Sequence, residues 1–494
     1  MSAYILAIDQ GTSSSRTVIF DSDLSPVASA QQEFEQFYPS PGWVEHDPEE
    51  IWSSVRSVSG DAMQKAGIGA GDVAAIGITN QRETTLVWRR DTGACIHKAI
   101  VWQDRRTADL CERLRADGHE ADVTRRTGLK LDPYFSATKV AWILDNVDGA
   151  RELAEQGQLA FGTVDCFLLW RLTDGAVHAT DISNASRTLL FNIHDECWDE
   201  SLLELFSIPM SMMPAVRDCA DDFGETRSDL FDAPIPISGI AGDQQAALIG
   251  QAGFAEGVTK STYGTGCFVI ANTGTEARPS HNQLLTTIAS RIDGKTTYGL
   301  EGSVFVAGSA IQWLRDELQI VDNAPQTEQI AEQTGIVDDV VVVPAFAGLG
   351  APYWDPHARG AVYGLSRGSG RNQLITATLQ AVAYQTRDLV RAMAEDGVMP
   401  KVIRVDGGMV ANNWFLQFLA DILDIPVERP TNVESTVLGA ACLAAYRSGL
   451  VKRMEDLEAL WQRDRLFEPD MDDQRRQALL AGWDDAVRRT SSTT

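Results

Sequence analysis

The chain has 494 residues, and a single hydrophobic core stops growing near ~250–300 residues, so at least two domains are expected. Its formal net charge of −27 argues against nucleic acid as a partner, because a phosphate backbone needs a basic footprint. No stretch reaches the ~20 apolar residues of a membrane span, and Asp9 interrupts the first apolar stretch before a signal-peptide pattern forms, so we expect a cytoplasmic protein.

Residues 4–38 have the pattern of three strands, and the first two flank the turn DQGTSSSR at residues 9–16. One interpretation of this turn is an ordinary hairpin. The other is a phosphate-binding turn, because the four small hydroxyl residues Thr12 to Ser15 let backbone N–H groups converge on an anion. Asp9 at the end of an apolar strand suits Mg²⁺, which needs one or two carboxylates and keeps several waters. The turn alone leaves both interpretations open.

Residues 46–67 predict a helix in which Asp47 is the N-cap, Pro48 takes the first helical position and Glu50 completes a capping box. Residues 73–88 predict a strand that runs into a polar loop containing Arg82 and Glu83. That pair is either an exposed ion pair or a donor and acceptor for a hydroxylated substrate. Residues 107–117 predict a helix, and residues 139–215 read as mostly helical with no recognisable chemistry.

Residues 235–250 predict a strand, a Gly-Asp turn and a helix, so Asp243 is either an N-cap or a general base at the carboxyl end of a strand. A second β-rich stretch follows at 258–274, and helices are expected at 308–318, 373–395 and 435–449. Residues 401–423 predict a strand, a Gly-rich turn and a helix. The turn is either an ordinary short strand-to-helix connection or a site where a ligand approaches the backbone closely and the helix N-terminus favours anions.

The two halves of the chain share an order of elements. Each opens on a β-hairpin with a Gly/Thr turn, and each later has a strand, a glycine turn and a helix. This order predicts an α/β protein with a duplicated domain and a cleft between the two copies. We place the boundary near residues 250–255, which gives domains at 1–252 and 253–494.

Several segments, in the same order over nearly the whole chain, resemble the FGGY family of carbohydrate kinases, among them DQGTSSSR, GITNQRET, GIAGDQQAAL, TYGTGCF and VDGGMVANN. Within that family the match is to the members that phosphorylate glycerol. The resemblance implies two ribonuclease-H-like domains of the actin/hexokinase/Hsp70 type around a central cleft. It also implies transfer of the γ-phosphoryl group of ATP to glycerol, giving sn-glycerol 3-phosphate. The alternatives are another polyol or sugar kinase of the family, or a non-catalytic actin-like ATP-binding protein.

By matching position, the resemblance implies site residues in both domains. The implied glycerol pocket, with Asp243 as the catalytic base, contains Arg82, Glu83, Trp102, Tyr134, Asp243, Gln244 and Phe268. The implied phosphate contacts of the first domain are Thr12, Ser13, Ser14 and Arg16. The implied nucleotide contacts of the second domain are Thr265, Gly308, Gln312, Gly408 and Asn412. Asp9 is expected near Mg²⁺.

The resemblance also bears on regulation and assembly. Some relatives carry a Gly-rich, Arg-ended loop for fructose bisphosphate before the strand at 235–242, but here that stretch reads TRSDLFDAP. Relatives switched by histidine phosphorylation carry a His shortly before it, and RDCADDFGET has none. We therefore expect neither form of control, and we expect a homo-oligomer, either a dimer or a tetramer.

Overall fold

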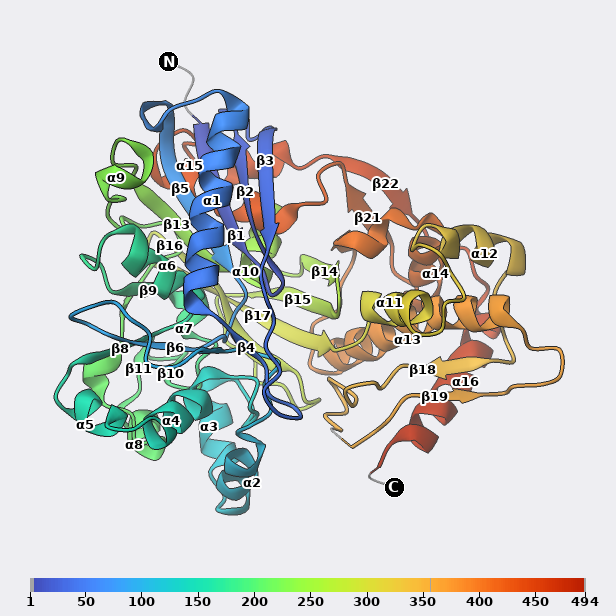
Figure 1. Cartoon of the computed structure of the whole chain (residues 1–494). Helices are drawn as coiled ribbons and strands as arrows, with labels where there is room; N and C mark the ends of the chain where they lie inside the picture. The colour runs from blue at the N-terminus through green and yellow to red at the C-terminus, as the bar shows by residue number, and fades with distance from the viewer. Residues whose placement is uncertain (1–3, 356, 493–494) are drawn as a thin grey trace.

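A five-stranded sheet forms the frame of the first half in the computed structural model, which describes residues 4–355 and 357–492 (Figure 1). Its strands lie in the order β13 (Ile237–Gly242), β5 (Val73–Asn80), β1 (Tyr4–Gln10), β2 (Ser14–Phe20) and β3 (Pro26–Glu33). The first three strands in sequence form an antiparallel meander, and β5 and β13 run parallel to β1. Residues 5–8 of β1 are completely buried, as expected for a strand covered on both faces.

A seven-stranded sheet frames the second half and repeats this order. Its strands are β16 (Leu285–Ile292), β17 (Lys295–Val304), β15 (Cys267–Gly274), β14 (Thr259–Tyr263), β20 (Ile403–Asp406), β21 (Val427–Pro430) and β22 (Arg463–Phe467). Strands β14, β15 and β17 form the antiparallel meander, while β20 runs parallel to β14 and β21 runs parallel to β20. The shared strand order confirms the predicted α/β fold with two ribonuclease-H-like units.

The helix predicted after the first meander is α1 (Pro48–Ala66), which packs on β2 and β3. Asp47 is its N-cap, as predicted, and its carboxylate accepts a hydrogen bond from the Glu49 N–H at 2.9 Å. The expected capping box does not form, because the Glu50 carboxylate instead accepts from the Glu35 N–H at 3.0 Å. A long-range partner therefore replaces the local one.

The prediction that residues 139–215 are mostly helical was wrong. Helices α4 (Ser136–Asn146), α5 (Ala150–Glu155), α6 (Val164–Leu172), α7 (Ile182–Ala185) and α8 (Glu200–Leu205) alternate with strands β8 (Leu159–Gly162), β9 (Ala179–Asp181), β10 (Phe191–Asn192), β11 (Cys197–Trp198) and β12 (Ala215–Arg217). These strands are too short to show a period of two, and they owe their conformation to pairing partners such as β6 (Leu86–Arg89).

The remaining elements mostly surround the two sheets. In the first half they are β4 (Glu45–His46), β7 (Ala99–Ile100), α2 (Ala108–Ala116), α3 (Glu120–Thr127) and α9 (Ser228–Phe231). In the second half they are α11 (Gly308–Asp316), α12 (Gln326–Thr334), β18 (Val341–Val343), β19 (Ala361–Tyr363), α13 (Arg371–Glu395), α14 (Asn413–Leu423) and α16 (Asp473–Thr490). Within the described ranges, no helix has the length and apolar character needed to cross a bilayer.

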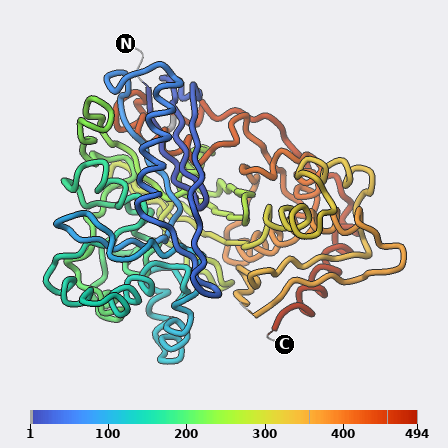
Figure 2. Tube along the Cα trace, viewed as in Figure 1, coloured from blue at the N-terminus to red at the C-terminus, as the bar shows by residue number. Residues whose placement is uncertain are grey.

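Two helices join the halves. Helix α10 (Asp243–Gly250) packs against α15 (Ser435–Arg447), and α15 also lies on the first sheet, although it belongs to the last quarter of the chain (Figures 1 and 2). A Cβ built on Gly77 of β5 would lie only 2.2 Å from the Ala440 carbonyl oxygen, so the helix sits directly on the strand. The division into domains at residue 252 stays a prediction, and α15 lies against the sheet of the other half.

Candidate functional site

The central charged residues of the site follow two neighbouring strands. Arg82 and Glu83 come just after β5, and Asp243 comes directly after β13, which pairs in parallel with β5. Parallel strands end at the same edge of a sheet, so these side chains are brought together there. Asp243 is the first residue of α10, and the N-cap is Gly242, so the N-cap interpretation of Asp243 was wrong. Its side chain is 31% exposed, which leaves it accessible to a ligand.

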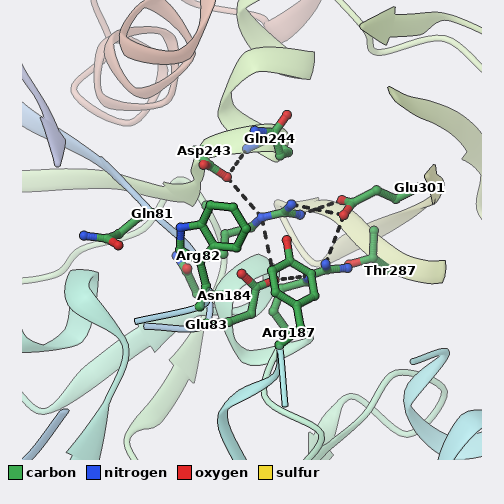
Figure 3. A network of polar contacts seen from close by, with 12 residues as sticks. Gln81, Arg82, Glu83, Asn184, Arg187, Asp243, Gln244, Thr287 and Glu301 are labelled. Carbon is green, nitrogen blue, oxygen red and sulfur yellow. Dashed lines mark hydrogen bonds and ion pairs between the residues drawn. The ribbon is translucent and has the colours of Figure 1, made fainter. Parts of the chain in front are cut away.

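Arg82 lies at the centre of a buried ion-pair network (Figure 3). Its Nε atom is 3.0 Å from Asp243 Oδ1, and its Nη1 and Nη2 atoms donate to the two carboxylate oxygens of Glu301 at 2.6 and 3.0 Å. Glu83 accepts from Arg187 Nε at 2.7 Å. Arg82 and Glu83 are both almost completely buried, so the interpretation as an exposed surface pair was wrong. Burial without such partners would be strongly unfavourable.

Three aromatic side chains lie beside this network, and we call them the aromatic wall: Trp102, Tyr134 and Phe268. The ring centroid of Trp102 lies 5.6 Å from that of Tyr134 and 6.1 Å from that of Phe268, both in edge-to-face geometry. Phe268 belongs to β15 of the second half, while Trp102 and Tyr134 belong to the first. Gln244, next to Asp243, accepts a hydrogen bond from the buried ammonium group of Lys260 on β14. The structure therefore gathers the predicted glycerol-pocket residues at one place between the two sheets.

The turn predicted to bind phosphate connects β1 to β2. Its backbone is closed by a 2.9 Å hydrogen bond from the Gly11 N–H to the Ser14 carbonyl, and Ser13 is exposed at its tip. Trp102 Nε1 donates to Thr12 Oγ1 at 2.9 Å, which ties the turn to the aromatic wall. Arg16 lies on β2, and its Nη1 atom forms a 2.6 Å ion pair with Glu434, the residue before α15.

The nucleotide residues predicted in the second half lie between β14 and β15, in the N-terminal half of α11, and between β20 and α14. The Thr265 carbonyl accepts from the Ala307 N–H, and the Gly308 N–H donates to the Gly264 carbonyl, both at 2.9 Å. Gln312 is exposed one turn further along α11. Gly408 is exposed after β20, and Asn412 caps α14 by accepting from the Phe415 N–H. Their contact with a nucleotide shared with Thr12, Ser13, Ser14 and Arg16 stays a prediction.

Comparison with known proteins decides the family. The N-terminal domain of the FGGY family of carbohydrate kinases matches residues 4–250, and its C-terminal domain matches residues 259–448. The chain belongs to the FGGY family of carbohydrate kinases. Its relatives include glycerol kinase 1 of Pseudomonas aeruginosa, 59% identical over 492 residues with all of both chains covered. The glycerol kinase of Rhodospirillum centenum is 60% identical and covers 99% of this chain and 98% of its own.

Solved structures support the same assignment. The Plasmodium falciparum glycerol kinase with ADP superposes with a TM-score of 0.92 at 36% identity, covering 99% of this chain and 98% of its own. The gluconate kinase of Lactobacillus acidophilus, at 22% identity and a TM-score of 0.89, covers 100% and 99% of the two chains and shows the shared fold. This FGGY kinase thus has the two-domain fold of the actin/hexokinase type that the resemblance implied.

Two charged residues of the network were not predicted from the sequence of this FGGY kinase. Arg187 falls in the region where no chemistry was recognised, and Glu301 lies within β17. Both are completely buried and pair with each other at 3.0 Å. The sequence does contain a pattern that indicates their burial. Each is the only charged residue in a long uncharged stretch, ISNASRTLLFNI at 182–193 and TTYGLEGSVFV at 296–306. An isolated charge in such a stretch needs a buried partner.

Asp9 is the predicted metal residue, and its environment is anionic. Burial, together with the nearby carboxylates of Asp243 and Glu434, raises the pKa of Asp9 to about 7 against the opposing effect of Arg16. Two carboxylates close together fit Mg²⁺, which binds proteins through one or two carboxylates and completes its shell with water and phosphate oxygens. The described residues contain no group of three or more His, Cys, Asp or Glu arranged to hold a metal. The magnesium site stays a prediction.

We expect the Asp9→Asn variant to be more thermostable than the wild type at neutral and alkaline pH. The folded-state pKa near 7 exceeds the ordinary value of 3.8, so the contribution of Asp9 to the free energy of unfolding falls as the pH rises from about 4 to about 7. Asparagine removes that charge, and Tm measured without nucleotide or metal should rise by roughly 1–3 °C at pH 8 and by less at pH 5. An equal gain at both pH values, or a loss at pH 8, would contradict the raised pKa.

Proposed function

We propose that this FGGY kinase transfers the γ-phosphoryl group of ATP to a terminal hydroxyl of glycerol and releases sn-glycerol 3-phosphate. The observation that carries the proposal is the convergence of Arg82, Glu83 and Asp243 beside an aromatic wall, in a chain whose full-length relatives at 59% and 60% identity are glycerol kinases. The site offers charged donors and acceptors on one side and apolar rings on the other. Glycerol has hydroxyl groups along one edge and C–H groups along the other.

The two sides of the site can recognise the two sides of glycerol. Arg82 donates to substrate oxygens, while Glu83 and Asp243 accept from substrate hydroxyls. Trp102 and Phe268 cover the C–H face. Each charged group is held by a protein partner, so a ligand that lacks one hydroxyl leaves a polar group unpaired and binds more weakly.

The chemistry needs a base and an anion-stabilising environment. Asp243 accepts the proton of the attacking hydroxyl, which makes the oxygen a better nucleophile as the phosphoryl group transfers. The backbone N–H groups of residues 12–14 and the Arg16 guanidinium stabilise the negative charge of the phosphates. Thr265, Gly308, Gln312, Gly408 and Asn412 hold the nucleotide from the second half. Mg²⁺, held by Asp9 with Asp243 nearby, would neutralise phosphate charge when bound.

A substrate panel tests the proposal. We expect kcat/KM with ATP to be higher for glycerol than for dihydroxyacetone, erythritol or a pentulose, and lower by roughly 10³-fold or more for propane-1,3-diol, which leaves the partner of the middle hydroxyl unpaired. Formation of glycerol 3-phosphate is measured directly in the same reactions. Preference for another of these polyols or sugars would assign the chain to a sibling activity. Nucleotide binding without any phosphorylated product would instead favour the non-catalytic alternative.

Two properties of the whole protein belong to the same proposal. We infer a cytoplasmic location, which cell fractionation tests. We also infer a homo-oligomer, either a dimer or a tetramer, which sedimentation velocity tests at the enzyme concentration used in the assay.

A further inference from the structure

Glu301 is the point where the second half of the chain reaches the polyol site. It lies within β17, its side chain is completely buried, and its carboxylate binds both Arg82 and Arg187 (Figure 3). Burial raises its pKa, but the guanidinium groups of Arg187 and Arg82 more than offset this effect and bring the pKa to about 2. Glu301 is therefore a fixed anion between two cations of the first half.

The contacts of Glu301 determine which donors of Arg82 remain available. A guanidinium group has five N–H donors in one plane. Three are used inside the protein, because Nη1 donates to Glu301 at 2.6 Å and to Gln245 at 3.3 Å, and Nη2 donates to Glu301 at 3.0 Å. The Nε atom is buried and makes no aligned hydrogen bond to the described residues, although Asp243 lies 3.0 Å away. Nε–H and one Nη2–H are thus the two donors of Arg82 that have no aligned acceptor among the described residues.

Arg187 has the equivalent effect on Glu83. Its Nε atom donates to Glu83 Oε1 at 2.7 Å, so that Oε2 is the oxygen left to accept from a ligand. The backbone of Glu83 is also constrained, with a φ of 60° that L-residues rarely adopt. Its carbonyl accepts from Thr85 Oγ1 at 3.0 Å and from Ser136 Oγ at 3.1 Å, which stabilises this conformation. Both the main chain and the carboxylate of Glu83 are therefore held in place.

We propose that Glu301 and Arg187 are positioning residues that make the site selective for a substrate with hydroxyls on neighbouring carbons. They do so by fixing two N–H donors of Arg82 and one oxygen of Glu83 toward the substrate. The inference rests on the proposed function and extends it, because it assigns part of the polyol selectivity to a strand of the second half. Two neighbouring donors in one plane suit two oxygens on adjacent carbons, and a substrate lacking one of them leaves a donor unpaired.

The experiment uses the full-length enzyme in two variants. Glu301→Gln removes the anion but leaves two buried arginines, so it carries a risk of misfolding. The double variant Arg187→Gln/Glu301→Gln removes one charge of each sign and keeps the net charge of the network. Glu256→Gln is the matched control, because Glu256 pairs with Arg278 at 2.6 Å on the exposed surface of the second half. Circular dichroism and Tm identify the folded variants.

Steady-state assays measure kcat and KM for each substrate, and calorimetric titration with glycerol in the absence of ATP measures Kd for glycerol. In the folded variant we expect KM and Kd for glycerol to rise at least about tenfold, while KM for ATP stays within about twofold. We also expect the ratio of kcat/KM for glycerol over propane-1,3-diol to fall at least about tenfold, because Arg82 is then free to rotate. A general loss of structure would raise both KM values and leave that ratio unchanged.

The outcome that overturns the inference is a folded double variant whose glycerol affinity and diol discrimination stay within about twofold of the wild type. The wild type is assayed first, which separates this failure from failure of the proposed function. If the wild type prefers another polyol, glycerol phosphorylation is wrong, and the same variants are compared on the preferred polyol. Loss of discrimination there supports the positioning role, and unchanged discrimination refutes it.

Discussion

The Asp243→Asn variant is expected to lower kcat for ATP-dependent glycerol phosphorylation by about 10²- to 10⁴-fold, the usual contribution of a positioned general base. Asparagine has nearly the same size as aspartate but cannot accept the proton of the attacking hydroxyl. The glycerol contacts of Arg82 and Glu83 remain, because Arg82 is still held by Glu301. The loss should therefore appear mainly in kcat, with KM for glycerol changed much less.

Initial rates of glycerol 3-phosphate formation at saturating ATP measure this effect. Asp91→Asn is the matched control, since Asp91 pairs with Arg89 at 2.8 Å in an exposed hairpin turn and its side chain is 60% exposed. The control should keep full activity. An Asp243→Asn enzyme with kcat within about tenfold of the wild type would exclude Asp243 as the base. An unchanged kcat with a greatly raised KM would assign it to substrate binding alone.

The elements that could be predicted from the sequence carry their own periodic signal. The helix at residues 46–67 has an N-cap, a proline and a buried stripe within one segment, so no distant partner is needed to recognise it. The repeated order of hairpin, strand and helix likewise predicted the duplicated fold. The short strands at 159–217 lack such a signal, because they span two to four residues and are defined by their partners.

The residues of the site also divide into those that local sequence can predict and those that it cannot. Asp243 could be predicted because it lies between a strand and a helix, where open sheets place their ligands. Arg82 and Glu83 were recognised as candidates, but local sequence left open whether they are exposed or buried. Their burial depends on Arg187 and Glu301, which lie 104 and 219 residues away from the residues they bind. Pairing over such separations is a property of the folded chain, and a lone charge in an otherwise uncharged stretch indicates only that some partner exists.

Replacing Gly439 by alanine is expected to destabilise the fold strongly. Helices α10 and α15 approach so closely that a Cβ on Gly439 would lie 1.8 Å from the Ala246 carbonyl oxygen, and one on Gly250 would lie 2.0 Å from the Ser435 carbonyl oxygen. Both obstacles are backbone atoms, which cannot move aside as a flexible side chain can. We expect the free energy of unfolding to fall by about 3 kcal/mol or more, the upper end for overpacking, in urea unfolding experiments.

Gly482→Ala on α16 is the matched control, because it makes the same change within a helix where a Cβ meets nothing within 4 Å. That variant should gain about 0.5–1 kcal/mol from the lower backbone entropy of the unfolded chain. A Gly439→Ala protein as stable as the wild type would show that α10 and α15 can separate freely. Since Asp243 begins α10, separation that moves the helix should also lower activity in the folded fraction. Retained activity in a strongly destabilised variant would instead mean that the position of Asp243 is set by β13 alone.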